Sequence, residues 1–351
     1  MDGPPGACPG VMAMGGALSL IADGRADQSL SIFDPASPPA QSIVNLSVLV
    51  LAITGFIFVV VEGILVYAIV RFRRRADAGV AEPPQVYGSK PIEIAWTAAP
   101  ALIVFVLVLV TTRTLWEVKV TPPPPRPGDN ALYATVVGRQ WWWEYTYDTY
   151  DGRPLGFTTA NELHVPVGEG GVQRPVYLML KSADVAHSFW VPRLAGKTDL
   201  IPNHPNTMWV EPHETGLYLG QCAQYCGTQH AKMLLRVYVQ TRDEFDRWIQ
   251  EQSRPAQLGG TVSAGQQIFE RTSCINCHTI AGTVANGTFG PDLTHLMSRE
   301  TIAAGAVANT LENLRQWVRD PGVIKPGSKM PAMGLSDPDV NAVVQYLETL
   351  R

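Results

Sequence analysis

Two long apolar runs constrain the fold of this 351-residue chain more than any other feature. The first extends from Ile43 to Val70 with Glu62 as its only charged residue, and the second extends from Ile92 to Leu109 and contains Glu93 and Pro100. A bilayer-spanning helix needs about 20 mainly apolar residues, whereas a soluble helix of that length shows a polar face with a period of 3.6 residues. Neither run has such a face, so both are predicted to cross a membrane.

Basic residues at one end of the first run indicate its orientation. Four arginines, at positions 71, 73, 74 and 75, follow the run directly, and short cytoplasmic loops collect Lys and Arg. The loop over 71–90 is therefore predicted to be cytoplasmic. The N-terminal tail and everything after about Thr111 are predicted to lie on the outer face, the periplasmic side in a bacterium. We expect a multi-pass protein of the bacterial inner membrane.

The chain divides into segments of distinct composition, as expected for a chain longer than one domain. They are an N-terminal tail over 1–40 that is a candidate for processing, the transmembrane hairpin over 41–118 with spans of about 43–70 and 92–115, a Pro-rich spacer over 119–130, a β-rich region over 131–240, a helix and linker over 241–261, and a mostly helical region over 262–351. Strand-like runs recur at 132–137, 176–180, 207–210, 217–220 and 235–239. The sequence therefore predicts a multidomain fold: a two-helix transmembrane hairpin, an all-β sandwich or barrel, and a mostly α domain.

The charge and the cysteine content limit the partners and the kinds of site that the chain can have. The net charge is -4 and 17% of the residues are charged, so the chain lacks the basic excess that neutralises phosphates, and nucleic acid is not an expected partner. Five cysteines occur, at 8, 222, 226, 274 and 277. The last four form two close pairs, which in an oxidising compartment can be disulfides, metal ligands or haem attachment points.

The first pair belongs to a cluster of soft and borderline metal ligands. Cys222, Cys226, His230 and Met233 lie within twelve residues, and His187 offers a further imidazole next to a β-rich run. Thiolate, imidazole and thioether together favour copper, because zinc sites seldom use Met. The alternative is a disulfide between the two cysteines. Four other histidines, at 164, 204, 213 and 295, carry no such pattern and are expected to be surface or hydrogen-bonding residues.

Further motifs accompany these ligands in a fixed order: Pro91–Thr97, Gly138–Trp143, His187–Pro192, and the pair Gly196 and Lys197. With them, residues 40–240 resemble subunit II of cytochrome c oxidase. The resemblance implies a cupredoxin sandwich over 131–240 that holds a dinuclear copper centre, called CuA. It also implies a ligand set in which two thiolates bridge the coppers, each imidazole binds one copper, and a thioether and one main-chain oxygen complete the site; these ligands are Cys222, Cys226, His187, His230, Met233 and Gln224.

Three further residues take their expected roles from the same resemblance. The commonest family pattern has Glu at the position of Gln224, where the side chain also helps to hold a magnesium ion, so the change to Gln weakens the case for magnesium. Trp141 matches the aromatic residue at which electrons enter, although Trp141–Trp143 could instead pack the sandwich or meet the membrane interface. Glu93 aligns with a carboxylate that opens a proton path, although it could also face water.

The second cysteine pair forms a haem attachment motif. In the Cys-x-x-Cys-His pattern, the thiols Cys274 and Cys277 add to the haem vinyl groups and His278 ligates the iron; a bare motif of this kind can also be a redox or zinc site. The flanking segments resemble class I cytochrome c: 265–269, 290–293, 326–331 and 339–350. The third contains the family's Pro-Gly-x-x-Met-Pro loop, so Met330 is expected as the sixth iron ligand, with Met333 as the alternative.

Together, the two resemblances imply the electron-entry subunit of a respiratory terminal oxidase. The expected path runs from an external donor, such as a cytochrome c or another redox carrier, through haem c to CuA. From there it continues to subunit I, which reduces oxygen to water with proton pumping, and subunit III is a further expected partner. No catalytic residue is expected on this chain, and the haem edge is expected to dock near Trp141. The alternative is a copper and haem subunit of a nitric oxide reductase, against which Glu93 and the oxidase-like second span argue.

Overall fold

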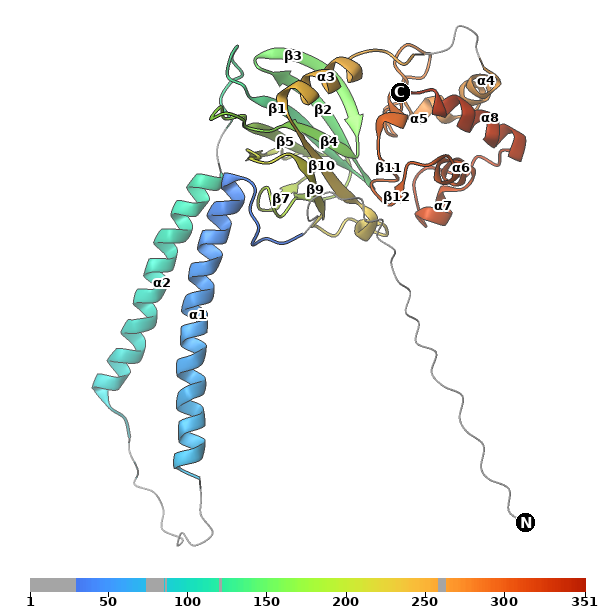
Figure 1. Cartoon of the computed structure of the whole chain (residues 1–351). Helices are drawn as coiled ribbons and strands as arrows, with labels where there is room; N and C mark the ends of the chain where they lie inside the picture. Colours follow the sequence, from blue (N-terminus) through green and yellow to red (C-terminus); the bar gives the residue numbers. More distant parts are fainter. Residues whose placement is uncertain (1–29, 74–84, 86, 120–121, 258–262) are drawn as a thin grey trace, which may run out of the picture.

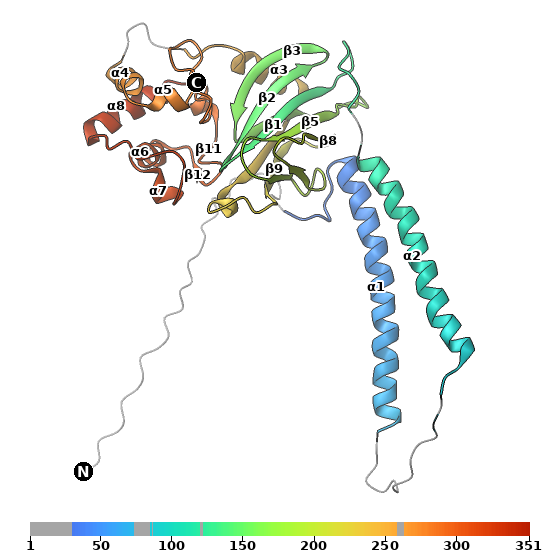
Figure 2. The same cartoon turned by 180° about the vertical axis from the view of Figure 1, so that it is seen from behind.

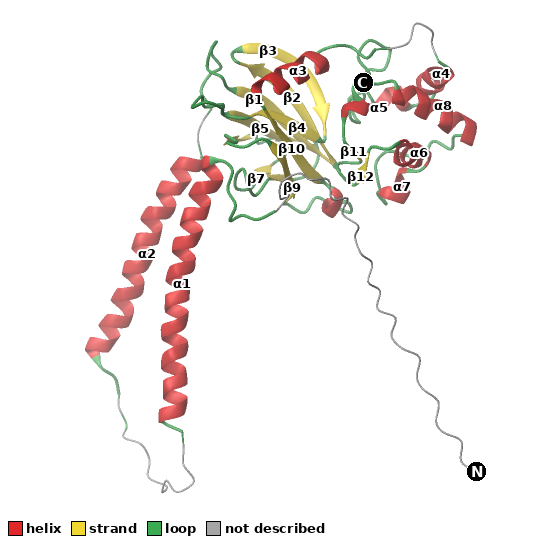
Figure 3. Ribbon diagram, viewed as in Figure 1, coloured by secondary structure: helices red, strands yellow, loops and turns green. Residues whose placement is uncertain are grey.

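The computed structural model describes residues 30–73, 85, 87–119, 122–257 and 263–351 (Figure 1). A helical hairpin, a β-sandwich and a mostly helical domain follow one another along the chain, which confirms the predicted fold class. Figure 3 shows the two β-sheets between the hairpin on one side and the C-terminal helices on the other. The predictions for the first 29 residues, including Cys8 and N-terminal processing, and for the arginines at 74 and 75 lie outside the described residues.

The hairpin consists of α1 (Pro38–Arg71) and α2 (Lys90–Val118), which run side by side (Figures 1 and 2). With 34 and 29 residues at 1.5 Å per residue, they extend about 51 and 44 Å, more than the roughly 30 Å of a bilayer core. Both are long and apolar enough to cross a membrane. The first helix begins five residues before the predicted span, because a proline at the first helical position needs no N–H partner.

Both helices are attached to the sandwich at the same end of the hairpin. The main-chain N–H of Glu211 donates to the Ser37 hydroxyl, just before α1, at 2.9 Å. The indole Nε1 of Trp209 donates to the carbonyl of Val118, the last residue of α2, at 3.1 Å. These hydrogen bonds hold the sandwich directly above the predicted spans.

Two five-stranded sheets form the sandwich, with the strand orders β3-β2-β1-β5-β8 and β4-β10-β9-β6-β7. Their strands are β1 (Leu132–Arg139), β2 (Trp142–Tyr150), β3 (Arg153–Ala160), β4 (Glu162–Pro166), β5 (Val176–Ser182), β6 (His187–Trp190), β7 (Thr198–Leu200), β8 (Asn206–Val210), β9 (Gly216–Cys222) and β10 (Leu234–Gln240). The pairs β1–β5 and β4–β10 are parallel, and the others are antiparallel. The five predicted strand runs lie in β1, β5, β8, β9 and β10.

Aromatic side chains of β2 fill the centre of the sandwich. Trp143, Tyr145 and Tyr147 are fully buried, while Glu144 and Thr146 between them are not. Successive side chains of a strand point to opposite faces of the sheet, so this alternation places three large rings between the two sheets. The resulting core includes Cys222, at the end of β9, and Cys226 in the loop that follows.

The C-terminal helices form a second core, separate from that of the sandwich. After α3 (Arg242–Gln252), the elements are α4 (Ala264–Arg271), α5 (Cys274–Cys277), η2 (Leu296–Ser298), β11 (Thr301–Ile302), β12 (Val307–Ala308), α6 (Leu311–Arg319), α7 (Pro321–Ile324) and α8 (Asp337–Glu348). The helices α4 and α8 approach closely at Gly265, where a Cβ atom would lie 1.9 Å from the carbonyl oxygen of Ala342. Phe269 packs edge-on against Tyr346, with ring centroids 5.8 Å apart.

Candidate copper and haem sites

Strand pairing brings the six predicted copper ligands to one end of the sandwich. Strand β9 ends at Cys222, and the loop that follows returns to the antiparallel partner β10. The main-chain N–H of Cys222 donates to the carbonyl of Met233 at 3.0 Å, which closes this loop. On the other side of β9, strand β6 pairs through Phe189 with Cys222. His187, two residues before Phe189, therefore lies beside the loop.

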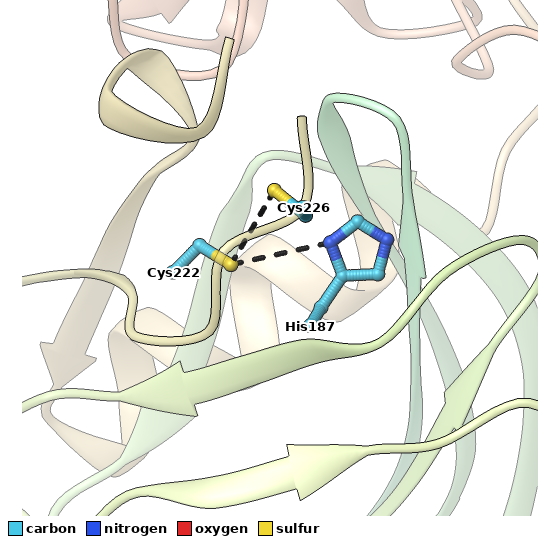
Figure 4. Close-up of side chains that lie close together, drawn as sticks. All are labelled: His187, Cys222 and Cys226. Carbon is cyan, nitrogen blue, oxygen red and sulfur yellow. Dashed lines mark hydrogen bonds between the residues drawn. The ribbon is translucent and has the colours of Figure 1, made fainter. Parts of the chain in front are cut away.

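Sulfur and nitrogen donors meet at this loop, where Figure 4 shows the two cysteine sulfurs facing each other and the imidazole of His187. The Sγ atoms of Cys222 and Cys226 are 3.8 Å apart. The Nδ1 atom of His187 lies 4.0 Å from the first sulfur, and that of His230 lies 3.6 Å from the second. The Met233 sulfur is 3.9 Å from the second sulfur.

The donor set fits a copper centre. The two cysteines are free thiols, because their sulfurs are far apart compared with the roughly 2 Å of a disulfide bond. The Sγ atom of Cys222 lies 3.2 Å from the carbonyl oxygen of Gln224, so this main-chain oxygen also faces the cluster, while Gln224 itself is exposed. Two thiols, two imidazoles, a thioether and a carbonyl, most of them buried, are donors that copper prefers.

The contact between the sulfurs of Cys222 and Cys226 shifts the pKa values of the two thiols in opposite directions. It lowers the pKa of Cys222 to about 3 and raises the pKa of Cys226, because one proton shared between neighbouring thiols leaves one of them ionised. Burial acts in the opposite direction on Cys222 and adds to the increase at Cys226. A metal cation that replaces the shared proton would allow both cysteines to be ionised, since thiolates are the metal-binding form of cysteine.

Asp184 orients one of the imidazoles. The Nε2 atom of the fully buried His187 donates to its carboxylate at 2.8 Å, which leaves Nδ1 facing the sulfurs as an acceptor. Burial alone lowers the pKa of His187, but the hydrogen bonds and charges of Asp184 and Cys222 together more than offset this and raise it. The same carboxylate accepts from the main-chain N–H of Gln140 at 2.7 Å. A carboxylate behind a metal-binding imidazole fixes its tautomer and increases its basicity.

The tryptophans of the β1–β2 turn occupy three different environments. The half-buried Trp141 donates from Nε1 to the carbonyl of Cys226 at 2.9 Å, and Gln140 Nε2 donates to the same oxygen at 2.8 Å. Trp142 lies under the Arg139 guanidinium, 5.4 Å from its carbon to the ring centroid. Trp143 packs in the core, 6.1 Å from the His187 ring. Of the three, only Trp141 reaches the copper loop by a hydrogen bond.

The haem attachment motif opens onto a cavity of about 280 Å³ that both domains line. The cytochrome side contributes Cys274, Cys277 and His278 together with Met330 and Met333. The lining is mainly apolar, as a porphyrin requires. The sandwich contributes the segment 139–142 and Asp184. Trp141, near which the haem edge was predicted to dock, therefore lines this cavity.

The imidazole of His278 is fixed for iron binding. Its Nδ1 atom donates to the carbonyl of Pro291 at 2.7 Å, which leaves Nε2 as the acceptor nitrogen. Burial lowers the pKa of this imidazole and keeps it in the neutral form that binds metals. Gly290 makes room for it, since a Cβ atom there would lie 2.7 Å from the ring. These residues fit a histidine-ligated haem.

A buried carboxylate joins the two domains on one side of the haem cavity. Glu162, at the start of β4, is 3% exposed and accepts from the main-chain N–H groups of Glu300 and Thr301 at 3.1 and 2.9 Å. It also accepts from the Thr301 hydroxyl at 2.7 Å. Burial raises its pKa, and these hydrogen bonds oppose the increase. Because all three donors belong to the cytochrome domain, the two domains share a specific interface.

Glu93, the predicted proton-path residue, lies apart from both clusters. It occupies the first turn of α2 and is exposed within the chain. The remaining histidines behave as hydrogen-bonding or surface residues: His164 contacts Gln240 and His295 Nε2 donates to the carbonyl of Arg254, whereas His213 is exposed.

Three residues at these sites, namely Asp184, Glu162 and Lys325, were not predicted from sequence patterns. Asp184 could have been found from its position three residues before His187, which is a spacing that allows a local hydrogen bond. The other two act through partners 139 and 184 residues away, so no local pattern marks them.

Three family profiles match successive parts of the chain. They are the transmembrane domain of cytochrome C oxidase subunit II over residues 26–113, the periplasmic domain of the same subunit over 132–240, and cytochrome c over 262–351. The matched ranges correspond to the hairpin, the sandwich and the C-terminal helices. The copper cluster therefore lies in the periplasmic-domain match and the haem motif in the cytochrome c match.

Curated relatives match nearly the whole chain. The cytochrome c oxidase subunit 2 of Alkalihalophilus pseudofirmus is 36% identical over 330 residues, covering 93% of this chain and 92% of the relative. That of Bacillus subtilis is 32% identical over 350 residues, covering 95% of each. Among solved structures, the periplasmic domain of subunit II of cytochrome oxidase from Bradyrhizobium japonicum is 27% identical with a TM-score of 0.32, covering 38% of this chain and 96% of that one.

Proposed function

Because this chain belongs to the cytochrome c oxidase subunit II family and is the electron-entry subunit of a haem-copper oxidase, we propose that electrons reach its copper centre through its own cytochrome domain. The proposed path runs from an external redox carrier to haem c, then to a dinuclear CuA centre, and on to subunit I. Oxygen is reduced to water there, with proton pumping. This chain supplies electron entry, and the oxygen chemistry belongs to the partner subunit.

The copper ligands that we propose are the six residues predicted from the sequence. Cys222 and Cys226 would bridge the metals, His187 and His230 would bind one copper each, and Met233 with the main-chain oxygen of Gln224 would complete the set. The convergence of these donors at one end of the sandwich, with four of the six residues buried, supports this assignment. The bound coppers would supply one-electron relay chemistry in a rigid site, which needs no open coordination position.

For the haem, we propose covalent attachment through Cys274 and Cys277, with His278 and Met330 as axial ligands. All four residues line one cavity, and Met333 lines it too as the alternative. Methionine opposite histidine gives haem iron a high potential, which suits an electron carrier. Trp141 would be the residue through which the electron passes to the copper loop.

The hydrogen bond from Trp141 to the carbonyl of Cys226 carries this proposal. Trp141 lines the haem cavity, and its indole nitrogen donates to the main chain of a proposed copper ligand at 2.9 Å. A single residue therefore contacts both proposed cofactor sites.

The remaining assignments concern the setting of the subunit. We place it in the bacterial inner membrane, with the copper and haem domains on the periplasmic side, bound to subunit I and also to subunit III. Glu93 is proposed to open a proton path into subunit I, and Gln224 leaves the magnesium ligand set incomplete. The relatives named above are oxidase subunits, which favours the oxidase over a nitric oxide reductase.

Metal content and paramagnetic resonance of the purified full chain, matured with haem c and reconstituted with copper, test the cofactor assignment. We expect about two coppers per haem and a mixed-valence signal, because two bridged metals share the unpaired electron. Cys222→Ser should abolish the signal and leave the haem spectrum unchanged, while Cys8→Ser, the matched control, should change neither. Copper binding that survives Cys222→Ser would contradict the assignment.

A further inference from the structure

Lys325 is the only lysine among the described residues that is buried, with 3% of its surface exposed. It follows α7 and begins the segment 325–331, which carries Met330 and is called the Met330 loop below. Lysines are almost never fully buried unless they are paired. Burial lowers the pKa of Lys325 to about 7, a measure of how unfavourable this environment is for an ammonium group. Such a position requires a structural or functional reason.

The acceptor of Lys325 is a main-chain oxygen of the other domain. Its Nζ atom donates to the carbonyl of Trp141 at 2.8 Å. This hydrogen bond does not depend on the charge of Lys325, because both the ammonium group and the neutral amine can donate. The contact joins the Met330 loop of the cytochrome domain to the β1–β2 turn of the sandwich.

Trp141 is thus held from two sides. Its carbonyl accepts from Lys325, and its indole Nε1 donates to the carbonyl of Cys226 at 2.9 Å. Two hydrogen bonds and one residue therefore connect the Met330 loop to the main chain of a proposed copper ligand. Gly227 leaves room for the ring, since a Cβ atom there would lie 3.0 Å from the indole.

We propose that Lys325 is a positioning residue, whose amine ties the Met330 loop to the main chain of Trp141 and holds the indole on the copper loop. The proposal rests on the electron path proposed above. That path requires a fixed position of Trp141 between the two cofactor sites, and Lys325 would maintain this position. Electron transfer between two protein-bound cofactors depends on a constant arrangement, as other reactions depend on preorganised groups.

Neighbouring contacts allow this role to be separated from simple docking of the two domains. Lys232 Nζ donates to the carbonyl of Ile324 at 2.7 Å, and Gln229 Nε2 donates to that of Pro326 at 2.6 Å. Both hydrogen bonds reach the same part of the cytochrome domain, and neither has Trp141 as a partner. Lys232 is exposed and is the matched control, because its loss also removes a lysine from the interface.

The experiment compares Lys325→Met, Lys325→Arg and Lys232→Met in the full chain loaded with haem c and copper. Hydrogen–deuterium exchange measures the protection of 140–142, 226–228 and 300–302, and photoreduction of the haem measures electron transfer to copper. In Lys325→Met, we expect faster exchange at 140–142 and 226–228, and transfer slowed about tenfold, as the loss of one hydrogen bond permits. Lys325→Arg, which keeps a donor, should restore part of the rate, and Lys232→Met should change neither quantity.

Two results would overturn the proposal. Unchanged exchange and transfer in Lys325→Met would show that Lys325 does not position Trp141. Faster exchange at 300–302 as well, where Glu162 joins the domains on the other side of the cavity, would show that Lys325 acts only in docking. Failure of the unsubstituted protein to pass an electron from haem to copper would instead contradict the proposed function, independently of the variants.

Discussion

At the scale of single residues, the geometry of the proposed copper site involves a carboxylate, that of Asp184, which is not itself a proposed copper ligand. Asp184 accepts from the Nε2 atom of His187 at 2.8 Å and from the main chain of Gln140 at 2.7 Å. It therefore couples the orientation of one imidazole to the turn that carries Trp141. Lys329 of the Met330 loop lies 3.9 Å from the same carboxylate, so the cytochrome domain also contacts this residue.

Replacing this carboxylate by an amide tests its role. Asp184→Asn keeps the size of the side chain but removes its charge, so Nδ1 of His187 becomes a weaker donor to copper. We expect the copper affinity to fall about 10- to 100-fold, the usual cost of losing such a partner. Competitive copper titration of the full chain measures the change. Asp199→Asn is the control, because the carboxylate of Asp199 pairs with Lys197 and not with a proposed ligand; an equal loss in both variants would contradict the role of Asp184.

At the scale of secondary-structure elements, a stack of three rings joins α3 to the sandwich. His164 of β4 lies between Tyr238 of β10 and Trp248 of α3, with ring centroids 4.8 and 4.4 Å apart. Its Nδ1 atom also contacts Gln240 Oε1 at 3.1 Å. Burial lowers the pKa of His164 from 6.5 to about 4, since a charged imidazole between two rings would be poorly solvated.

This shift predicts an acid-dependent loss of stability. Between pH 6.5 and 4 the unfolded chain protonates His164 while the folded chain does not, so stability that is present above pH 6.5 is lost as the pH falls through this window. The loss in the free energy of unfolding approaches about 3 kcal/mol. Calorimetry of the full chain should show a smaller pH dependence of the Tm of the sandwich in His164→Phe, which keeps the stack. His213→Phe, at an exposed position, should behave like the unsubstituted chain; equal pH dependence in all three would contradict this account.

At the scale of the whole molecule, the cytochrome domain is fixed to the sandwich on both sides of the haem cavity. Glu162 accepts three hydrogen bonds from 300–301 on one side, and Lys325 donates to Trp141 on the other. Arg236 of β10 adds an ion pair with Glu300 at 3.1 Å. If the haem donates to the copper centre of its own chain, as proposed, this step needs no diffusional encounter, so its rate should not depend on protein concentration.

Much of this organisation follows from local sequence patterns. The membrane hairpin and the cysteine motifs are recognisable because their determining residues lie within one helix or within twelve positions, as in Cys222–Met233. Five of the ten strands of the sandwich were not predicted, among them β2, although its buried Trp143, Tyr145 and Tyr147 alternate with less buried residues. The interface between the domains was beyond sequence reasoning, because Glu162 and Lys325 find their partners far along the chain and bond mainly to main-chain atoms, which carry no sequence signal.

The most direct test of the central claim is time-resolved absorption after photoreduction of the haem in the full chain loaded with copper. We expect the haem to become oxidised at the same rate as the copper centre becomes reduced, and we expect that rate to be independent of protein concentration. A rate that rises with concentration, or oxidation of the haem without reduction of copper, would contradict the proposal that the cytochrome domain feeds the copper centre of its own chain.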